Sequence, residues 1–247
     1  MTVDIRTGLC GFSMALNDYV TEFPLVEVQQ TFYEPPREST MRRWRAVAPD
    51  AFEFIVKAWQ LVTHEATSPT YRRLRRSLTT SERADVGGFR TSPIALEGWA
   101  RSVEAASILR ASAILVQCPP SFRPTEPNVD RLRAFMTTVD RPVGIRILWE
   151  PRGGWPPELV RSLCVELGLV HVVDPFVDRS VTPEATYYRL HGITGPRHVY
   201  DDDELRRLLA MIPRETAGTA DVLFNNIGRI DDARRFVDLA AASRTGS

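Results

Sequence analysis

Eight short runs rich in β-branched and aromatic residues recur along the chain, and most are separated by segments with helical apolar spacing. The runs lie at 5–10, 25–32, 52–57, 113–118, 143–149, 169–173, 186–191 and 221–225. Eight strands that alternate with helices within 247 residues are typical of an α/β fold, the (β/α)8 TIM-type barrel. A doubly wound open sheet is the alternative, but no Gly-x-Gly-x-x-Gly follows any run. The pattern therefore favours a single barrel domain over residues 1–247.

Helix start signals precede several of the intervening segments. They are Ser39 and Thr40, Pro127–Asn128, Pro156–Pro157 and Asp201–Asp203. A last helical segment, from Asp231 to Ala241, is expected near the end of the chain.

The connection between the third and fourth predicted strands is much longer than the others. The extra length, an insertion at about 60–95, is rich in arginine: within it, residues 70–90 contain Arg72, Arg73, Arg75, Arg76, Arg83 and Arg90 against Glu82 and Asp85. Since it follows a strand, it should lie on the C-terminal face, where barrel loops build active sites. We consider two interpretations, a solvated helix face and a lid that attracts anions.

Composition limits the possible partners. The chain has 31 basic and 31 acidic residues, so a bulk electrostatic attraction to nucleic acid or to an anionic membrane is not expected. No apolar run is long enough to span a bilayer, and the first residues do not resemble a signal peptide. Cys10, Cys118 and Cys164 form no Cys-x-x-Cys pair and are expected to be small buried residues. We therefore expect a reduced, cytoplasmic protein with no membrane association.

Lysine is almost absent. Of the 31 Lys and Arg residues, Lys57 alone is lysine. A lysine retained in so arginine-rich a chain suggests a position where a planar guanidinium cannot replace a compact ammonium group, although chance retention is the alternative.

Strand periodicity places polar residues inside the barrel. Side chains alternate between the two faces of a strand, and the apolar face must pack against the helices. The inward set is then Glu27, Gln29, Lys57, Gln117, Arg146, Glu150, Asp174, Arg189 and His191. Burying so many ionisable groups is costly unless they pair, so the set is either a structural network or a site. Charged groups at the carboxyl ends of barrel strands favour a site.

Two other histidines are assigned simpler roles. His171 is opposite in strand phase to Asp174 and is expected to be a packing residue. His198 is expected in a loop, at the pocket rim or in solvent.

Several segments together resemble the YecE-like family (domain of unknown function 72, DUF72), whose members are similar to (β/α)8 barrels. They are FPLVEVQQTFYEPP, PDAFEFIVKAW, Thr63–His64, LVQCPPSF, WEPRGGW, Asp174, YYRLHG, Tyr200 and LFNN with Asn225–Asn226, in this order. The resemblance runs from about Gly8 to Ala240. Departures include Gly11-Phe12-Ser13-Met14 for the family's Gly-Trp-Ser-Tyr and Glu27-Val28-Gln29 for its Glu-Ile-Asn. The resemblance implies a fold and a site but no reaction.

The first functional hypothesis is an enzyme that acts without a metal on a small anionic or polyhydroxylated substrate. Lys57 would be an electrophile, a phosphate clamp or a Schiff-base nucleophile, and Glu150 and His191 would transfer protons. The substrate-binding residues would be Glu27, Gln29, His64, Gln117, Arg146, Arg152, Trp155, Asp174, Arg189, Asn225 and Asn226. No metal or other cofactor is predicted, the partner is a small molecule, and the oligomeric state is left open.

Two alternatives differ in class. A metal-dependent hydrolase or isomerase would use Glu27, Glu150, Asp174, His64 and His191 as ligands of a divalent metal, and a version similar to endonuclease IV would bind nucleic acid through the insertion. A protein that binds a metabolite in the same pocket without turnover is the third hypothesis.

Overall fold

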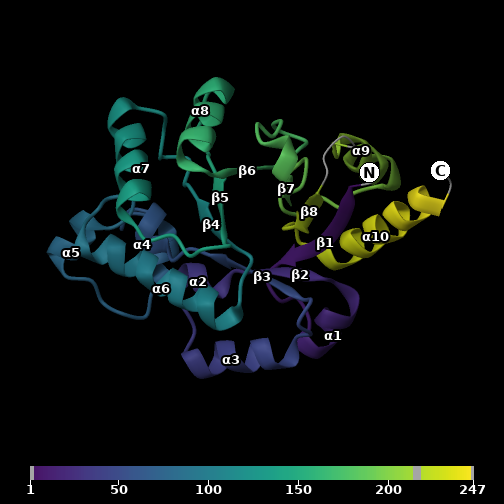
Figure 1. Cartoon of the computed structure of the whole chain (residues 1–247), viewed down its shortest axis with the longest axis horizontal. Helices are drawn as coiled ribbons and strands as arrows, with labels where there is room; N and C mark the ends of the chain where they lie inside the picture. Colours follow the sequence, from purple (N-terminus) through teal and green to yellow (C-terminus); the bar gives the residue numbers. More distant parts are fainter. Residues whose placement is uncertain (1–2, 214–217, 246–247) are drawn as a thin grey trace.

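The computed structural model describes residues 3–213 and 218–245 as a closed barrel of eight parallel strands. The strands follow chain order around the barrel, and β8 pairs with β1 to close it (Figure 1). Their bounds are β1 Asp4–Cys10, β2 Leu25–Val28, β3 Glu53–Lys57, β4 Ala113–Gln117, β5 Arg146–Glu150, β6 Val170–Val173, β7 Tyr187–Leu190 and β8 Thr219–Phe224. The predicted (β/α)8 barrel is confirmed.

Helices fill most of the connections and cover the outside of the barrel (Figure 1). They are α1 Leu16–Glu22, α2 Gln30–Tyr33, α3 Glu38–Val47, α4 Gln60–Thr63, α5 Thr80–Asp85, α6 Pro93–Leu109, α7 Glu126–Thr138, α8 Pro157–Leu167, α9 Asp202–Met211 and α10 Arg229–Thr245, with 3-10 helices η1 Pro69–Arg73 and η2 Pro183–Ala185. The β6–β7 connection departs from strict alternation, because within the described residues it carries only η2.

The start signals were accurate to within a few residues. Asp201, the first residue of a predicted start signal, is the N-cap of α9, and its side chain and that of Glu204 cap each other's backbone N–H groups. Ser39 and Thr40 instead lie inside the first turn of α3, which begins at Glu38 after Arg37.

Two predicted strands lose three or more residues of their apolar runs. The second run leaves the sheet after Val28 and turns directly into α2. The fifth run loses its first residues, because Gly144 adopts a left-handed φ of 78° and Val143 is fully exposed in the turn before β5.

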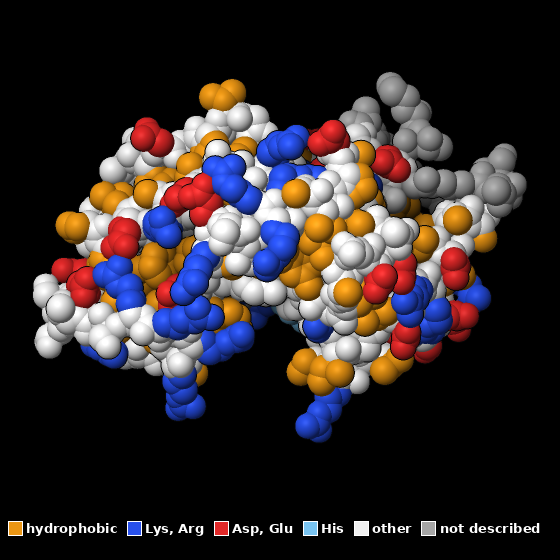
Figure 2. Space-filling view, turned by 90° about the horizontal axis from the view of Figure 1, so that it is seen from below, with side chains coloured by type: hydrophobic (Ala, Val, Ile, Leu, Met, Phe, Trp, Pro, Cys, Tyr) orange, Lys and Arg blue, Asp and Glu red, His pale blue; other side chains and the backbone are white. Residues whose placement is uncertain are grey.

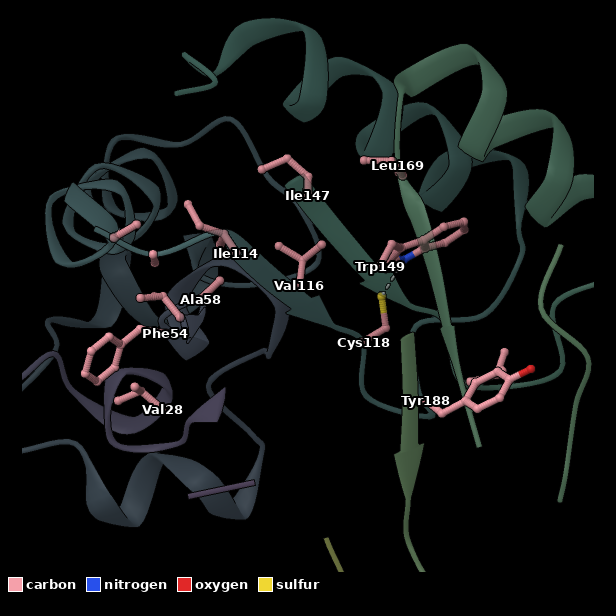
Figure 3. Close-up of a cluster of buried hydrophobic side chains, with 14 of the residues drawn as sticks. Val28, Phe54, Ala58, Ile114, Val116, Cys118, Ile147, Trp149, Leu169 and Tyr188 are labelled. Carbon is pink, nitrogen blue, oxygen red and sulfur yellow. Dashed lines mark hydrogen bonds between the residues drawn. The ribbon is translucent and has the colours of Figure 1, made fainter. Parts of the chain in front are cut away.

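Outward-facing strand residues form the main core with the helices. Figure 3 shows Val28, Phe54, Val116 and Trp149 from neighbouring strands within this layer. The indole of Trp149 donates to the Sγ of buried Cys118 over 3.3 Å. All three cysteines are free and buried, as expected of small packing residues.

The inward-facing residues form three layers. At the amino ends of the strands, Asp221 accepts hydrogen bonds from Arg6 at 2.8 Å and Arg146 at 2.9 Å, and Arg6 also pairs with Glu53. The middle layer is apolar and includes Leu25, Ile55, Ala113, Leu115, Leu148, Val172 and Leu223. The third layer, at the carboxyl ends, is polar again and contains the candidate site.

The insertion after β3 is a packed segment with its own apolar cluster, which includes Trp59, Leu61 and Val86. Its end returns to its beginning, since the backbone N–H groups of Gly87 and Phe89 donate to the carbonyls of Leu61 and Val62. Among the helices in residues 3–213 and 218–245, none combines the length and the hydropathy needed to cross a bilayer.

Candidate active site

Five polar residues from five strands meet at the carboxyl end of the barrel interior. They are Glu27 on β2, Lys57 on β3, Gln117 on β4, Glu150 on β5 and Arg189 on β7. The sheet register brings neighbours level, for example Gln117 opposite Glu150. Four of the five are at most 6% exposed, and Gln117 is half-buried. The structure therefore places much of the predicted polar set in one cluster.

Arg189 is the centre of this cluster. Its guanidinium donates to Gln117 at 3.1 Å and to Glu27 at 2.9 Å, and it also pairs with Glu150. Burial alone would lower the pKa of Arg189, but Glu150 and Glu27 outweigh it and raise the pKa well above its ordinary value. Arg189 is thus a permanent buried cation that fixes two carboxylates.

Glu150 is the most heavily bonded carboxylate of the cluster. Besides Arg189, its Oε1 accepts hydrogen bonds from Arg152 at 2.6 and 2.8 Å and lies 3.3 Å from His191 Nε2. Burial would raise its pKa, but Arg189, His191 and Arg152 together hold the pKa well below 4.5. Glu150 therefore remains ionised at neutral pH, which suits charge stabilisation better than proton donation.

Lys57 lies beside this network but forms no ion pair with any described residue. Its ammonium lies 4.2 Å from the centre of the Phe32 ring and 3.4 Å from Gln29 Oε1. Burial, together with the neighbouring Arg189, lowers the pKa of Lys57 from 10.5 to about 8, although Glu27 and Glu150 act in the opposite direction. A substantial neutral fraction of this amine is then present just above neutral pH.

Gln29 connects Lys57 to the carboxylates. Its side-chain NH₂ donates to Glu27, and its oxygen accepts from Lys57. Because Gln29 lies at the N-cap position of α2, directly after β2, the early end of that strand directs this amide to the mouth of the barrel.

His191 stands at the solvent side of the cluster, with 30% of its side chain exposed. Its Nδ1 lies 3.1 Å from Asn225 Nδ2, and its Nε2 lies 2.9 Å from Arg152. Asp174 holds the segment in place by accepting the backbone N–H groups of His191 at 2.8 Å and Phe176 at 3.1 Å. Arg152 and Asn225 both present N–H donors to the ring, of which a neutral imidazole accepts one, and the ring lies partly exposed at the mouth.

His64 adjoins Lys57 through an aromatic contact. Its ring packs edge-on against Phe32 at 4.8 Å, and Nδ1 lies 2.8 Å from the hydroxyl of Thr63. Burial, with Lys57 and Arg152 nearby, lowers the pKa of His64 to about 3. His64 is thus a neutral imidazole at physiological pH.

Three predicted site residues lie elsewhere. Arg146 faces the interior but occupies the opposite end of the barrel, where it pairs with Asp221. Trp155 packs outside the barrel against Phe122 and Trp149, and its indole donates to the Phe122 carbonyl at 2.9 Å. Buried Asn226 donates to the carbonyl of His198 and to Asp232, and so braces the loop before α10.

Tyr187 is a cluster residue that the candidate set omitted. Its hydroxyl donates to Glu27 over 3.0 Å from the fully buried interior of β7. Strand alternation could have identified Tyr187, since it shares a strand face with Arg189 and His191. Of the other histidines, His171 is buried and accepts the N–H of Val181 at 3.2 Å, whereas His198 pairs with Glu204 at 2.9 Å in the β7–α9 loop.

The carboxylates proposed as metal ligands are already bound to guanidinium groups or backbone amides. Across residues 3–213 and 218–245, no group of three or more His, Cys, Asp or Glu side chains has a geometry suited to a metal ion.

A cleft of about 380 Å³ adjoins the cluster on the side of the insertion. It lies between the loop after α4 and the loop after β4, and His64 forms one of its walls. The remaining lining residues are Glu65, Thr67, Ser68, Pro69, Pro119, Pro120 and Ser121.

Comparisons with known proteins identify relatives of the whole chain. Residues 10–246 match the family model described as Protein of unknown function DUF72. A solved DUF72 family protein from Enterococcus faecalis V583 is 23% identical with a TM-score of 0.68, covering 97% of this chain and 98% of that one. Another, from Thermotoga maritima MSB8, is 19% identical with a TM-score of 0.67, covering 96% and 99%.

An enzyme is also among the similar folds. Endonuclease IV from Thermus thermophilus is 14% identical with a TM-score of 0.54, covering 96% of this chain and 98% of that one. No curated protein matches the sequence. These structural likenesses show the fold alone, whereas the family model spans nearly the whole sequence. The chain therefore belongs to the DUF72 family.

Proposed function

We propose that this protein is an enzyme that acts, without a metal ion, on a small carbonyl compound bearing an anionic group, with Lys57 as its reactive amine. The observation that carries the proposal is the environment of Lys57. It is 6% exposed, lies next to the buried cation Arg189, and has its pKa lowered to about 8 by burial and by that neighbour. An amine desolvated beside another cation is a recognised way to obtain a nucleophilic lysine.

In this proposal, different residues of the cluster attack the carbonyl, transfer protons and bind the anionic group. The neutral amine of Lys57 attacks the carbonyl carbon, the carbonyl oxygen leaves as water after protonation, and an imine remains. His191 is the group placed to supply and remove protons, because its ring is partly exposed and its Nε2 lies 3.3 Å from the carboxylate of Glu150. Arg152 is paired with Glu150 through Nε and Nη2, but a third of its side chain is exposed and its Nη1 has no hydrogen bond to a described residue, so this nitrogen can bind an anionic substituent.

Glu150 and Arg189 play an electrostatic role in this proposal. An ionised Glu150 held by two guanidinium groups stabilises the positive charge of a protonated imine or of His191. The carboxylates of the cluster are engaged by arginine, which supports a mechanism that relies on organic acid–base groups.

Reductive trapping tests the proposal directly. The protein is incubated with pyruvate, a 2-oxo acid that carries a carbonyl next to an anionic group, and treated with borohydride. We expect one reduced adduct by mass spectrometry, located at Lys57 by peptide mapping; the single lysine makes the assignment unambiguous apart from the α-amino group. The variants Lys57→Arg and Lys57→Met should lose the adduct. Equal trapping in these variants, or no trapping in the wild type, would show that Lys57 is not the reactive amine.

A second candidate function is the binding of nucleic acid, and it has one favourable observation. In the insertion, Arg72, Arg75 and Arg83 are exposed and form no ion pair with a described residue, although Arg76 and Arg90 are paired with glutamates. Figure 2 shows basic side chains across the face seen from below, with acidic side chains among them. Binding of a DNA duplex that weakens steeply as salt rises would support this candidate.

Reductive trapping alone does not distinguish an enzyme from a protein that binds the compound without turnover, so a second measurement is needed. If Lys57 forms the adduct, conversion of the trapped compound into a different product decides between them.

A further inference from the structure

The cleft beside His64 is built for a ligand group without charge. Three hydroxyl side chains line it, and three prolines form flat apolar walls. The one carboxylate on its edge, Glu65, lies 3.3 Å from Arg90, so its charge is already balanced. A volume of about 380 Å³ lies near the lower end for small-molecule sites, about 300–1,000 Å³.

Two of the hydroxyls are available for a ligand. Ser68 is used within the protein, since its Oγ caps η1 and lies 2.8 Å from the hydroxyl of Thr70. Thr67 and Ser121 are exposed, and their hydroxyls form no hydrogen bond within the described part of the chain. Hydroxyl groups that both donate and accept suit hydroxylated ligands, whose own groups do the same.

One wall of the cleft lies close to the reactive amine. His64 forms a wall of the cleft and packs against Phe32, whose ring also holds the ammonium of Lys57 at 4.2 Å. His64 Nδ1 is taken by Thr63, whereas Nε2 has no hydrogen bond to any residue that the structure describes. The cleft and the amine are therefore linked through the contact between His64 and Phe32.

We infer that the substrate has two parts, a carbonyl with its anionic group at Lys57 and Arg152, and an uncharged polyhydroxylated chain in the cleft lined by His64, Thr67 and Ser121. The inference rests on the proposed function and narrows it to hydroxylated oxo acids of sugar-acid type.

Three 2-oxo acids with the same reactive end test the inference by isothermal titration calorimetry, which needs no turnover. They are pyruvate, 2-oxohexanoate, which adds an apolar tail, and 2-oxo-3-deoxygluconate, which has the same carbon count with a hydroxylated tail. We expect the hydroxylated acid to bind at least tenfold more tightly than either of the others, or about 1.4 kcal/mol. Two hydroxyl hydrogen bonds contribute about this much.

Variants locate the preference in the cleft. The double variant Thr67→Val, Ser121→Ala removes both free hydroxyls with little change in volume, and we expect the affinity ratio between the hydroxylated and apolar acids to fall towards one. Ser162→Ala, an exposed position on the outer helix α8, should keep the ratio of the wild type.

Each failure has a separate meaning. A ratio near one in the wild type, a ratio unchanged in the double variant, or no binding of the hydroxylated acid at millimolar concentration would overturn the two-part substrate. If the wild-type protein forms no pyruvate adduct at Lys57 in the reductive trapping experiment, the proposed function itself is overturned.

Discussion

Replacing Lys57 with methionine is expected to stabilise the protein while abolishing its reactive amine. The pKa of Lys57 is lowered from 10.5 to about 8, first by burial and then by Arg189, and this difference corresponds to about 3 kcal/mol of destabilisation by the charged form. The contact of the ammonium with the Phe32 ring offsets about 1 kcal/mol. Methionine has a similar length and no charge, so we expect Lys57→Met to gain about 2 kcal/mol at pH 7.

The gain should depend on pH in a defined window. Below pH 8, Lys57 is charged in both the folded and the unfolded state, and the full destabilisation is present. Between about pH 8 and 10.5 the folded protein has released this proton whereas the unfolded chain still binds it, so the wild type gains stability relative to the variant. The difference between them should fall below about 1 kcal/mol at pH 10.

Urea denaturation of both proteins at pH 7, 9 and 10 measures the effect, because the titration of other groups cancels in the difference. Lys57→Arg is the matched control, since its charge persists at every pH and should give no gain. If Lys57→Met is less stable than the wild type at pH 7, or if the difference is independent of pH, the ammonium of Lys57 is not destabilising and the argument for a neutral amine fails.

Three further substitutions test the packing around the site. Arg189→Met leaves the buried Glu27 and Glu150 without their shared cation, and we expect a loss of about 3–5 kcal/mol by urea denaturation; a loss below about 1 kcal/mol would contradict the central role of this guanidinium. Tyr187→Phe removes one donor to Glu27 and should cost about 1–3 kcal/mol, with thermal unfolding as the measurement and no change in stability as the contrary result. Gly8→Ala places a Cβ in steric conflict with the backbone carbonyl oxygen of Leu25 in β2, so we expect a clear drop in melting temperature; an unchanged melting temperature would mean that β1 and β2 can move apart at this point without cost.

Much of the candidate site was predictable because alternation along a strand is a local property. The sequence pattern identified Glu27, Lys57, Gln117, Glu150 and Arg189 as inward-facing, and the structure brings all five together. The pattern also placed Tyr187 on the same face as Arg189 and His191, but alternation alone does not show that its hydroxyl would bind the carboxylate of Glu27.

The wrongly placed candidates are residues whose membership of the site depends on their position along the barrel axis. Arg146 and Glu150 share one face of β5, so alternation alone treats them alike, yet four residues of strand separate them by about 13 Å. Arg146 therefore meets Asp221 at the amino end, whereas Glu150 meets Arg189 at the carboxyl end. Trp155 was misplaced for a related reason, since the turn after β5 carries it to the outer layer.

Residue spacing and composition alone establish the eight-strand alternation, the inward face of each strand and the presence of a single lysine among the candidates, because none of these requires knowledge of the contacting residues. The folded barrel was needed to show which inward residues lie level with one another, that Lys57 faces an aromatic ring instead of a carboxylate, and that His64 lies between the cluster and a cleft. The reason is that strand register and loop packing set these contacts, and both depend on residues far apart in the chain.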